Sequence, residues 1–243
     1  MENKIEVVTI NSFKEFLNNI EVWTEVNPQG FFLFRGQTRD LPLVPKIGRY
    51  TNIKDIEKFE KSILDDFKKR CQPYLKGNIH TEWDLLALAQ HYGLPTRLLD
   101  WTENPLVALW FATEISLLKN DHGVVWMFDP LEEDILGLEK SSPFDDGRTK
   151  VFCPNHISER ITAQNGWFSC HKITQRGALK YFVPFERITT YKHSIEKMII
   201  PQSLFPEIRV KLNSLGINAS TIYPDLAGLA RHLTWKHLKA ERF

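Results

Sequence analysis

Apolar residues recur at helical spacing in the first third of the chain. The first such stretch begins at Ser12, and Glu15 lies three residues later, a pair typical of a capping box. Its apolar positions are Phe13, Phe16, Leu17 and Ile20. The second stretch covers residues 54–70, an otherwise charged segment whose apolar stripe is formed by Ile56, Phe59, Ile63, Leu64 and Phe67. Both patterns predict amphipathic helices.

Two further helices in the middle of the chain are indicated by residues that favour helix ends. Thr81 is an N-cap candidate for a helix that ends at Gly93, because glycine accepts the left-handed backbone that commonly follows a helix. Asn104 and Pro105 have the order of an N-cap and a first-turn proline. They predict a largely apolar helix that runs to about Leu118.

The C-terminal part of the chain predicts another two helices. The apolar positions of the first are Leu204, Ile208, Leu212 and Leu215, and Gly216 closes it. The second begins after Pro224. Its inward-facing positions are expected to be Leu226, Leu229, Leu233 and Leu238.

Short apolar and aromatic runs between the helices predict strands. The glycine-bounded runs GFFLFRG at residues 30–36 and GVVWMFD at residues 123–129 are typical of buried strands, and residues 167–173 and 194–200 predict two more. Residues 131–150 are turn-rich and acidic and are expected to form an exposed excursion. Helices and strands mix without regular βαβ alternation, which favours an α+β fold over a doubly wound sheet.

The composition is that of an ordinary globular protein, with 42% hydrophobic and 25% charged residues. The 31 Lys and Arg residues nearly balance the 30 Asp and Glu residues, so no bulk charge favours nucleic acid or a membrane. Three widely spaced cysteines indicate neither a disulfide framework nor a zinc site. With no secretion signal and no apolar run of bilayer length, we expect a single cytoplasmic domain that does not contact a membrane.

Arg35 forms the first candidate site, because a charge at the end of an apolar run is costly unless it has a partner. Its planar guanidinium matches phosphate or carboxylate groups, and Gly36 beside it would let a ligand approach the backbone. The alternative is a structural arginine paired with a core carboxylate such as Asp100. Both interpretations stay open.

The second candidate site lies between two apolar segments. Its polar and aromatic members are His91, Tyr92, Thr96, Arg97, Asp100 and Trp101. Tyr92 and Thr96 are the better candidates for touching a ligand. An Arg97–Asp100 pair that holds the loop is the structural interpretation of the two charges, and it is favoured over direct catalysis.

The third candidate site is the charged and amide-rich segment 159–168, which leads into an aromatic strand with His171 beyond it. Gln164 could hydrogen-bond a hydroxyl or amide, and Phe168 could stack on a flat ring. An Asn-Gly turn with its supporting amide explains the same residues structurally. The usual motifs for phosphate loops, zinc hydrolases and serine hydrolases do not occur in the sequence.

The chain resembles the FRG domain family, which is named for its Phe-Arg-Gly tripeptide, here Phe34-Arg35-Gly36. The resemblance continues through HYGLPTRLLDWTENPLVALWFA at residues 91–112, RITAQNGWF at 160–168 and YPDLAGLARHL at 223–233. It implies a single FRG domain over residues 1–243, with a core at about 28–235. Because the family is mostly described without an activity, the resemblance alone implies no reaction.

The order of features is also similar to ADP-ribosyltransferases of the arginine–serine–glutamate type. In those proteins an arginine on a first core strand precedes a strand with Ser or Thr, a helix of Ala-Leu-x-Phe-Ala character and another strand. Arg35 and Thr96 match the first two positions, residues 108–112 the helix and residues 124–128 the next strand. The similarity implies an ADP-ribosyltransferase-like α+β fold of two packed β-sheets surrounded by helices.

This resemblance implies NAD as a substrate and a site that needs no metal. Arg35 would hold the phosphates or the nicotinamide ribose, Thr96 would orient that ribose, and the rings of Tyr92 and Phe168 would sandwich the nicotinamide. The residues assigned to the cofactor are Arg35, Gly36, His91, Tyr92, Thr96 and Phe168. Breaking the nicotinamide–ribose bond passes through an oxocarbenium-like state, which a carboxylate stabilises in glycosidases.

The resemblance departs at the catalytic glutamate, which usually enters a late strand. Gln164 is the nearest aligned residue, and its amide cannot offset developing positive charge. Glu159 lies five residues earlier and could substitute only if the loop folds back. The catalytic set is therefore Arg35 and Thr96, with Gln164 or Glu159 replacing the glutamate, unless NAD is bound without turnover or the fold serves another purpose.

Three functions follow from these observations. The first is an NAD-dependent enzyme that transfers ADP-ribose to a protein or nucleic acid, or hydrolyses NAD; analogy suggests a toxin or phage-defence effector with an antitoxin-like regulator. The second is a non-catalytic FRG binding module that recognises a protein or nucleic acid. The third is a metal-dependent hydrolase using Asp100, Glu103 and His91 or His171, residues without a recognisable ligand spacing.

Overall fold

The computed structural model describes residues 5–28, 30–75, 79, 81–114, 122–136, 142–145, 147–155 and 164–238. These residues form a mixed α+β fold, which confirms the predicted class. A seven-stranded mixed sheet and a two-stranded sheet are built from β1 (Glu6–Thr9), β2 (Leu33–Gln37), β3 (Leu98–Thr102), β4 (Gly123–Phe128), β5 (Lys150–Phe152), β6 (Gly166–Cys170), β7 (Thr174–Arg176), β8 (Leu179–Tyr181) and β9 (Ile195–Ile200).

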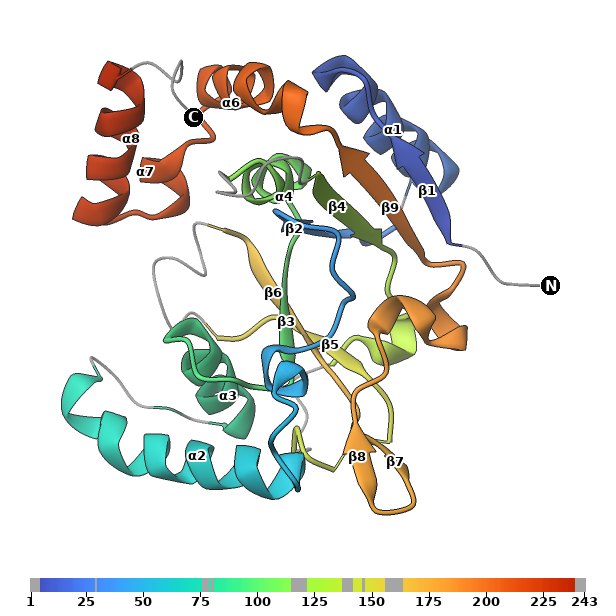
Figure 1. Ribbon diagram of the computed structural model, residues 1–243, viewed down its shortest axis with the longest axis vertical. Coiled ribbons are helices and arrows are strands. Elements are labelled where there is room, and N and C mark those ends of the chain that lie inside the picture. The colour runs from blue at the N-terminus through green and yellow to red at the C-terminus, as the bar shows by residue number, and fades with distance from the viewer. Residues whose placement is uncertain are drawn as a thin grey trace.

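Seven α-helices accompany these strands in the described residues (Figure 1). They are α1 (Phe13–Val26), α2 (Ile56–Cys71), α3 (Glu82–His91), α4 (Pro105–Ala112), α6 (Phe205–Ser214), α7 (Ala219–Ile222) and α8 (Leu226–Leu238). Helices α7 and α8 lie together at one end of the molecule, and the β7–β8 hairpin lies at the other.

The large sheet has the strand order β1-β9-β4-β2-β3-β6-β5, with β1 and β9 parallel and the other pairs antiparallel. Strand β2 pairs with β4 along its whole length, from Leu33 to Gln37. In contrast, β2 and β3 share a single residue pair, Phe34 with Thr102. The sheet therefore consists of two well-paired halves joined at a narrow junction, and Figure 1 shows the halves diverging from it.

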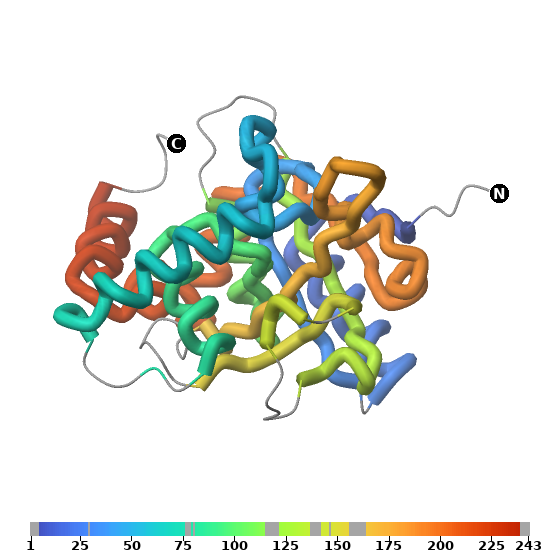
Figure 2. Tube along the Cα trace, turned by 90° about the horizontal axis from the view of Figure 1, so that it is seen from below, coloured from blue at the N-terminus to red at the C-terminus, as the bar shows by residue number. Residues whose placement is uncertain are grey.

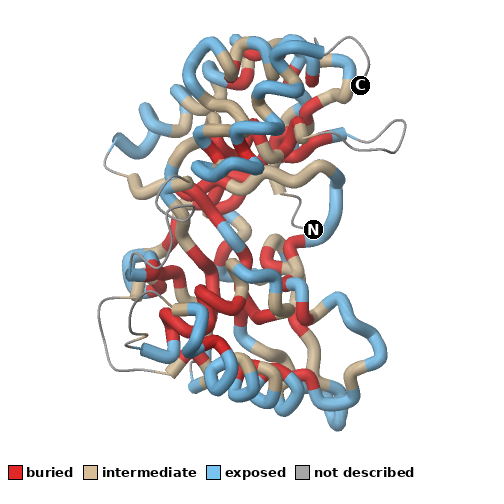
Figure 3. The backbone as a smooth tube through the Cα atoms, turned by 90° about the vertical axis from the view of Figure 1, so that its left-hand side faces the viewer, coloured by how far each residue is buried: buried red, intermediate tan, exposed pale blue. Residues whose placement is uncertain are grey.

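Side-chain alternation assigns different cores to the two faces of β2. Phe34 faces a cluster formed by α1, α4 and α6, which includes Phe16, Trp110 and Ile208. Leu33 faces a second cluster with Trp101, Trp126, Phe128 and Phe185. Figure 3 shows the buried residues in the interior of the molecule and the exposed residues around it.

Helices α2 and α3 cover the half of the sheet that contains β3, β6 and β5 (Figure 2). Their cluster joins Leu64 of α2 and Leu86 of α3 to Phe152 and Phe168 of the strands. Helix α3 is buried at seven of its ten positions, so its sequence has little amphipathic contrast.

The predicted helix starts are confirmed, because capping depends on nearby residues. Ser12 Oγ accepts a hydrogen bond from Glu15 N at 3.1 Å, and Thr81 Oγ1 accepts one from Asp84 N at 3.0 Å. Asn104 Oδ1 accepts one from Leu106 N at 2.9 Å. The end predicted near Leu118 is wrong: α4 stops at Ala112 with Thr113 as its C-cap, and residues 115–118 lie outside the described residues.

Two other expectations are corrected by burial. The leucines of α8 expected to face inward are exposed, with exposed fractions of 84% for Leu226 and 68% for Leu238. The segment 131–150 is not a wholly exposed excursion, because Asp134 is fully buried. Its Oδ2 accepts hydrogen bonds from Arg148 Nη2 at 3.1 Å and from the Tyr191 hydroxyl at 2.8 Å, and these bonds compensate for burying the charge.

No helix among the described residues combines the length and apolar character needed to cross a bilayer.

Candidate functional site

Arg35 lies in the middle of β2, opposite Trp126 of β4, on the face that it shares with Leu33. Its Nη1 donates a hydrogen bond to the Asp100 carbonyl at 2.6 Å and lies 3.5 Å from Asp100 Oδ2. The Arg35 side chain is 16% exposed and that of Asp100 is 58% exposed. The arginine thus crosses the narrow junction between the two halves of the sheet, and its predicted pairing with Asp100 is present.

The charge of Arg35 is only partly compensated. Burial lowers the pKa of Arg35, the neighbouring Asp100 raises it, and the positive charge of Arg49 lowers it further. Its Nε is buried and has no hydrogen-bond partner among the described residues. A mostly buried guanidinium with an unused donor is a group that an incoming anion would stabilise.

Gly36 has a packing role that the sequence interpretation did not include. A Cβ at this position would lie 1.9 Å from the carbonyl oxygen of Ala108 and 2.7 Å from the nitrogen of Ala112, both in the backbone of α4. Glycine is therefore required for α4 to rest directly against β2. This contact, rather than the approach of a ligand, accounts for the glycine that follows Arg35.

Thr96 is connected to Asp100 through one intervening side chain. The Thr96 hydroxyl donates to Gln90 Oε1 at 2.6 Å, and Gln90 Nε2 donates to Asp100 Oδ2 at 3.2 Å. Thr96 also accepts a hydrogen bond from Leu98 N at 3.2 Å. With 1% of its surface exposed, Thr96 orients Gln90 and Asp100 rather than offering its own hydroxyl to solvent.

Arg97 does not pair with Asp100, which corrects the predicted loop pair. Its Nε donates to Glu60 Oε2 at 2.8 Å, and its backbone nitrogen donates to Glu60 Oε1 at 2.6 Å. Both side chains are at least 95% buried. Burial raises the pKa of Glu60, and the charge and hydrogen bonds of Arg97 act in the opposite direction. This pair holds the segment before β3 against α2.

His91 and Tyr92 lie at the C-terminal end of α3, on the surface near Asp100. Their rings meet edge to face with centroids 5.0 Å apart, and Tyr92 is 67% exposed. Lys46 Nζ donates to the carbonyl oxygen of Gly93 at 2.7 Å, which brings a second cation to this turn. Tyr92 is therefore accessible to solvent, and its stacking role stays a prediction.

Gln164 and Phe168 do not join Arg35. The side-chain Nε2 of Gln164 donates to the backbone carbonyl oxygen of Ile222 at 3.1 Å. The backbone carbonyl oxygen of Gln164 accepts a hydrogen bond from Thr102 Oγ1 at 2.6 Å. Phe168 is 3% exposed and packs against Phe152 with ring centroids 5.7 Å apart, so it has no free face for a nicotinamide. Glu159 lies outside the described residues.

Trp101 and His171 were named from the sequence, but the buried polar chain that joins them through Ser169 beside Arg35 was missed. Trp101 Nε1 donates to Ser169 Oγ at 2.8 Å, and Ser169 Oγ lies 2.8 Å from His171 Nε2. His171 Nδ1 is buried without a hydrogen-bond partner among the described residues. Burial, and then the charge of Arg35, lower the pKa of His171 to about 3, so its imidazole is neutral at pH 7. The signal available in the sequence was the spacing of Ser169 and His171, because residues two apart in an extended segment lie on the same face.

No metal cluster lies at this site among the described residues, and three described cavities lie away from it. Among the described residues, no group of three or more His, Cys, Asp or Glu side chains could hold a metal ion. Three cavities of about 700, 530 and 580 Å³ lie elsewhere, and neither Arg35, Thr96 nor Gln164 lines any of them. The Arg35 site therefore consists of a mostly buried guanidinium, its partner Asp100, and the Gln90 side chain that Thr96 orients.

Comparison with known proteins identifies one family. Residues 31–121 match the model of the FRG domain, a range that runs from just before β2 through α4 and so contains Arg35, Thr96 and Asp100. No curated protein and no solved structure gives a significant match.

Proposed function

We propose that this chain, whose residues 31–121 belong to the FRG domain family, binds NAD at Arg35 as a protein of ADP-ribosyltransferase-like architecture. The order of the elements supports the proposal. Arg35 lies on β2, Thr96 precedes β3, α4 follows, and β4 comes next in the chain. Strand β6, which Gln164 precedes, lies beside β3 in the sheet. The two packed sheets that the resemblance implies are not formed by the described strands, which make one seven-stranded and one two-stranded sheet; the halves of the large sheet share a single β2–β3 residue pair next to Arg35.

The incompletely compensated guanidinium of Arg35 is the observation that carries the proposal. An arginine kept only for structure is expected to pair with a buried carboxylate, as Arg97 does with Glu60, although Arg97 Nη2 is likewise left without a partner among the described residues. Arg35 instead uses a backbone carbonyl and an exposed carboxylate, and it leaves Nε unused among the described residues. This state suits an arginine that exchanges a weak internal partner for the phosphates of a ligand.

Neighbouring groups fit the remaining parts of NAD. Arg49 lies close enough to lower the pKa of Arg35, and Lys46 contacts the turn at Gly93, so two more cations are available for a pyrophosphate. The exposed ring of Tyr92 offers a stacking surface for the nicotinamide. Gln90 and Asp100, held by Thr96, offer an amide and a carboxylate to ribose hydroxyls.

The proposed reaction breaks the bond between the ribose C1′ and the nicotinamide nitrogen. The bonding electron pair stays on the nitrogen, so nicotinamide leaves as a neutral molecule. The oxygen or nitrogen of water or of a macromolecular acceptor then bonds to C1′ and releases its proton to solvent. Because Gln164 is engaged with Ile222, we assign stabilisation of the oxocarbenium-like state to Asp100. A catalytic role for Glu159 stays a prediction, because this residue lies outside the described residues. By analogy, a toxin or phage-defence effector with an antitoxin-like regulator would use this activity.

Two assays test the proposal. Calorimetric titration with NAD measures binding, and release of nicotinamide measures turnover, for the wild type, Arg35→Lys and Asp100→Asn. We expect Arg35→Lys to weaken binding about tenfold, because an ammonium cannot replace a bidentate fork. Asp100→Asn should slow turnover more than it weakens binding.

Arg176→Met, on the exposed β7–β8 hairpin, is the matched control. A folded wild-type protein that does not bind NAD would refute the proposal.

A second function, the non-catalytic FRG binding module, is favoured by the exposed apolar surface of α8. Its exposed leucines are Leu226, Leu229, Leu233 and Leu238. Large apolar side chains exposed together on one helix are typical of an interface with another protein. If the stable protein fails to bind NAD, and substitution of these leucines by serine abolishes capture of a partner, the module is the better description.

A further inference from the structure

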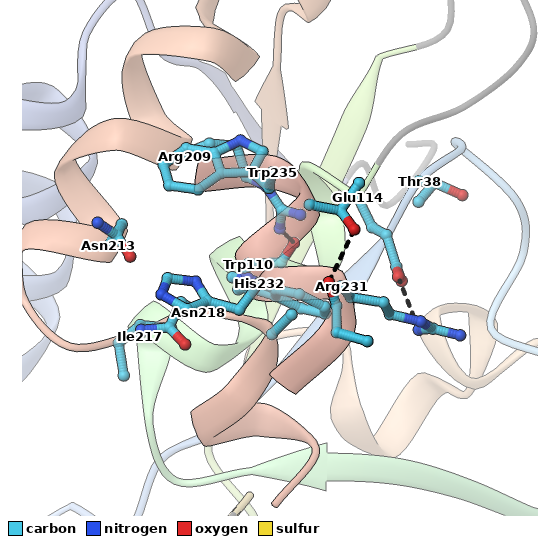
Figure 4. A pocket seen from close by; sticks show the side chains of 13 residues that line it. Thr38, Trp110, Glu114, Arg209, Asn213, Ile217, Asn218, Arg231, His232 and Trp235 are labelled. Atoms are coloured by element: carbon cyan, nitrogen blue, oxygen red, sulfur yellow. Dashed lines mark hydrogen bonds and ion pairs between the residues drawn. The ribbon is translucent and has the colours of Figure 1, made fainter. Parts of the chain in front are cut away.

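The largest of the three cavities lies between α4, α6 and α8, on the other side of the sheet from Arg35. Its volume is about 700 Å³, within the range of about 300–1,000 Å³ that is usual for small-molecule sites. Trp110 of its lining packs in the same cluster as Phe34, whereas Arg35 is on the opposite face of β2. Figure 4 shows the side chains of Trp110, Arg209 and Trp235, which come from α4, α6 and α8, around this space.

Arg209 of α6 is the best-anchored cation in the cavity. Its Nη1 donates to the carbonyl oxygen of Trp110 at 3.2 Å, and its guanidinium lies over the Trp110 ring, 4.4 Å from the centroid. Burial lowers the pKa of Arg209 to about 10, so the group stays charged at pH 7. In the described part of the chain it forms no ion pair with a carboxylate, and its charge is available to a ligand.

A second guanidinium, that of Arg231 on α8, lies at the edge of the same cavity. Its Nη1 is 3.9 Å from Glu114 Oε1, a weak and exposed ion pair. Glu114 is the single carboxylate in the described lining, against two arginines. The lining therefore has a net positive charge that favours an anion.

An aromatic surface accompanies these cations. Trp235 of α8 is half-buried, and its ring is stacked with that of His232, with centroids 6.3 Å apart and an interplanar angle of 24°. His232 Nδ1 is buried and has no hydrogen-bond partner in the described residues. A ligand with a flat ring and hydrogen-bonding edges would use both residues, because the indole offers a face and the imidazole offers an unused polar atom.

We propose that the cavity between α4, α6 and α8 binds a nucleoside monophosphate. Arg209 and Arg231 contact the phosphate, Trp235 stacks on the base, and His232 hydrogen-bonds its edge or the ribose. A simple anion would use only the guanidinium groups, and an uncharged aromatic compound would use only the indole. A nucleotide uses both sets, which lie in one cavity of suitable volume. This site is separate from the surface proposed for NAD.

Calorimetric titration with adenosine 5′-monophosphate, adenosine and inorganic phosphate tests the inference on the intact chain. We expect saturable binding of the monophosphate to the wild type, and at least about tenfold weaker binding of adenosine or phosphate alone. Trp235→Ala and Arg209→Lys should each raise the Kd of the monophosphate about tenfold, because one loses base stacking and the other the planar fork. Arg231→Gln, at an exposed position, should have a smaller effect in the same direction and keeps the test valid if Arg209→Lys does not fold.

The controls distinguish this site from the proposed NAD site. Arg176→Met and Tyr74→Ala remove an exposed cation and an exposed ring far from the cavity and should leave the Kd unchanged. Arg35→Lys should also leave the Kd of the monophosphate unchanged while it weakens the binding of NAD. The inference is overturned if the wild type does not bind the monophosphate. It is equally overturned if Trp235→Ala and Arg231→Gln bind it as well as the wild type, or if Arg35→Lys abolishes its binding.

Discussion

Two arginines next to β3 have different environments: Arg97 directly precedes this strand, and Arg35 contacts it from β2. Arg97 is buried with Glu60 and donates to that carboxylate from both its side chain and its backbone. Arg35 holds a backbone carbonyl and a largely exposed Asp100, and its Nε has no partner among the described residues. The first arrangement is a structural pair with a fully buried carboxylate, although Arg97 Nη2 also has no partner among the described residues. The second is an arginine that can change partners, and this difference separates stability from function in the same part of the molecule.

Breaking the Arg97–Glu60 pair should produce the largest loss of stability. Arg97→Met leaves an uncompensated carboxylate in the core, and we expect the free energy of unfolding to fall by about 3–5 kcal/mol. Urea denaturation measures the change. A loss below about 1 kcal/mol, the usual value for exposed pairs, would show that this pair is no better satisfied than the pair at Arg35.

Gly36→Ala tests the packing that positions Arg35. The added Cβ would approach the carbonyl oxygen of Ala108, a backbone atom that cannot rotate away. We expect a loss of about 1–3 kcal/mol in the free energy of unfolding, typical of overpacking, as α4 moves off β2. Gly147→Ala is the matched control, because a Cβ there meets nothing within 4 Å. Equal stability of the two variants would mean that α4 does not fix β2.

The neutral His171 beside Arg35 makes stability depend on pH. Its pKa in the folded protein is about 3, against 6.5 when unfolded, so below pH 6.5 the unfolded chain binds a proton that the native state does not. The contribution of the neutral His171 to the free energy of unfolding is present above pH 6.5. It is lost as the pH falls, by about 1.4 kcal/mol per pH unit. His171→Gln should remove this dependence between pH 6.5 and pH 4, as measured by urea denaturation at several pH values. Identical pH profiles for the two proteins would contradict the assignment.

Local signals in the sequence were sufficient for the α+β class and for the helix starts. Ser12, Thr81 and Asn104 act on backbone groups two or three residues away, so no distant contact is needed to recognise them. Short elements were not predictable in this way. Strand β1 and the β7–β8 hairpin are largely exposed and lack apolar alternation, and their pairing partners decide their structure.

Long-range contacts account for the errors at the site. The partner of Arg97 is 37 residues away in α2, and the reason for Gly36 is the backbone of α4, neither of which a local pattern contains. The pairing of Arg35 with Asp100 was the structural alternative to a ligand site and is present, but Asp100 was expected to be a core carboxylate and its side chain is 58% exposed. Phe168 was assigned to a ligand from its chemistry alone, whereas its packing against Phe152 beneath α2 and α3 places it in the core.

The most direct test of the central claim compares Arg35→Lys with the wild type in two measurements on one preparation, NAD calorimetry and urea denaturation. We predict that the wild type binds NAD, that the variant binds it about tenfold more weakly, and that the free energy of unfolding changes by less than about 1 kcal/mol. A loss of about 3–5 kcal/mol in stability, with NAD bound by neither protein, would instead make Arg35 a structural arginine like Arg97.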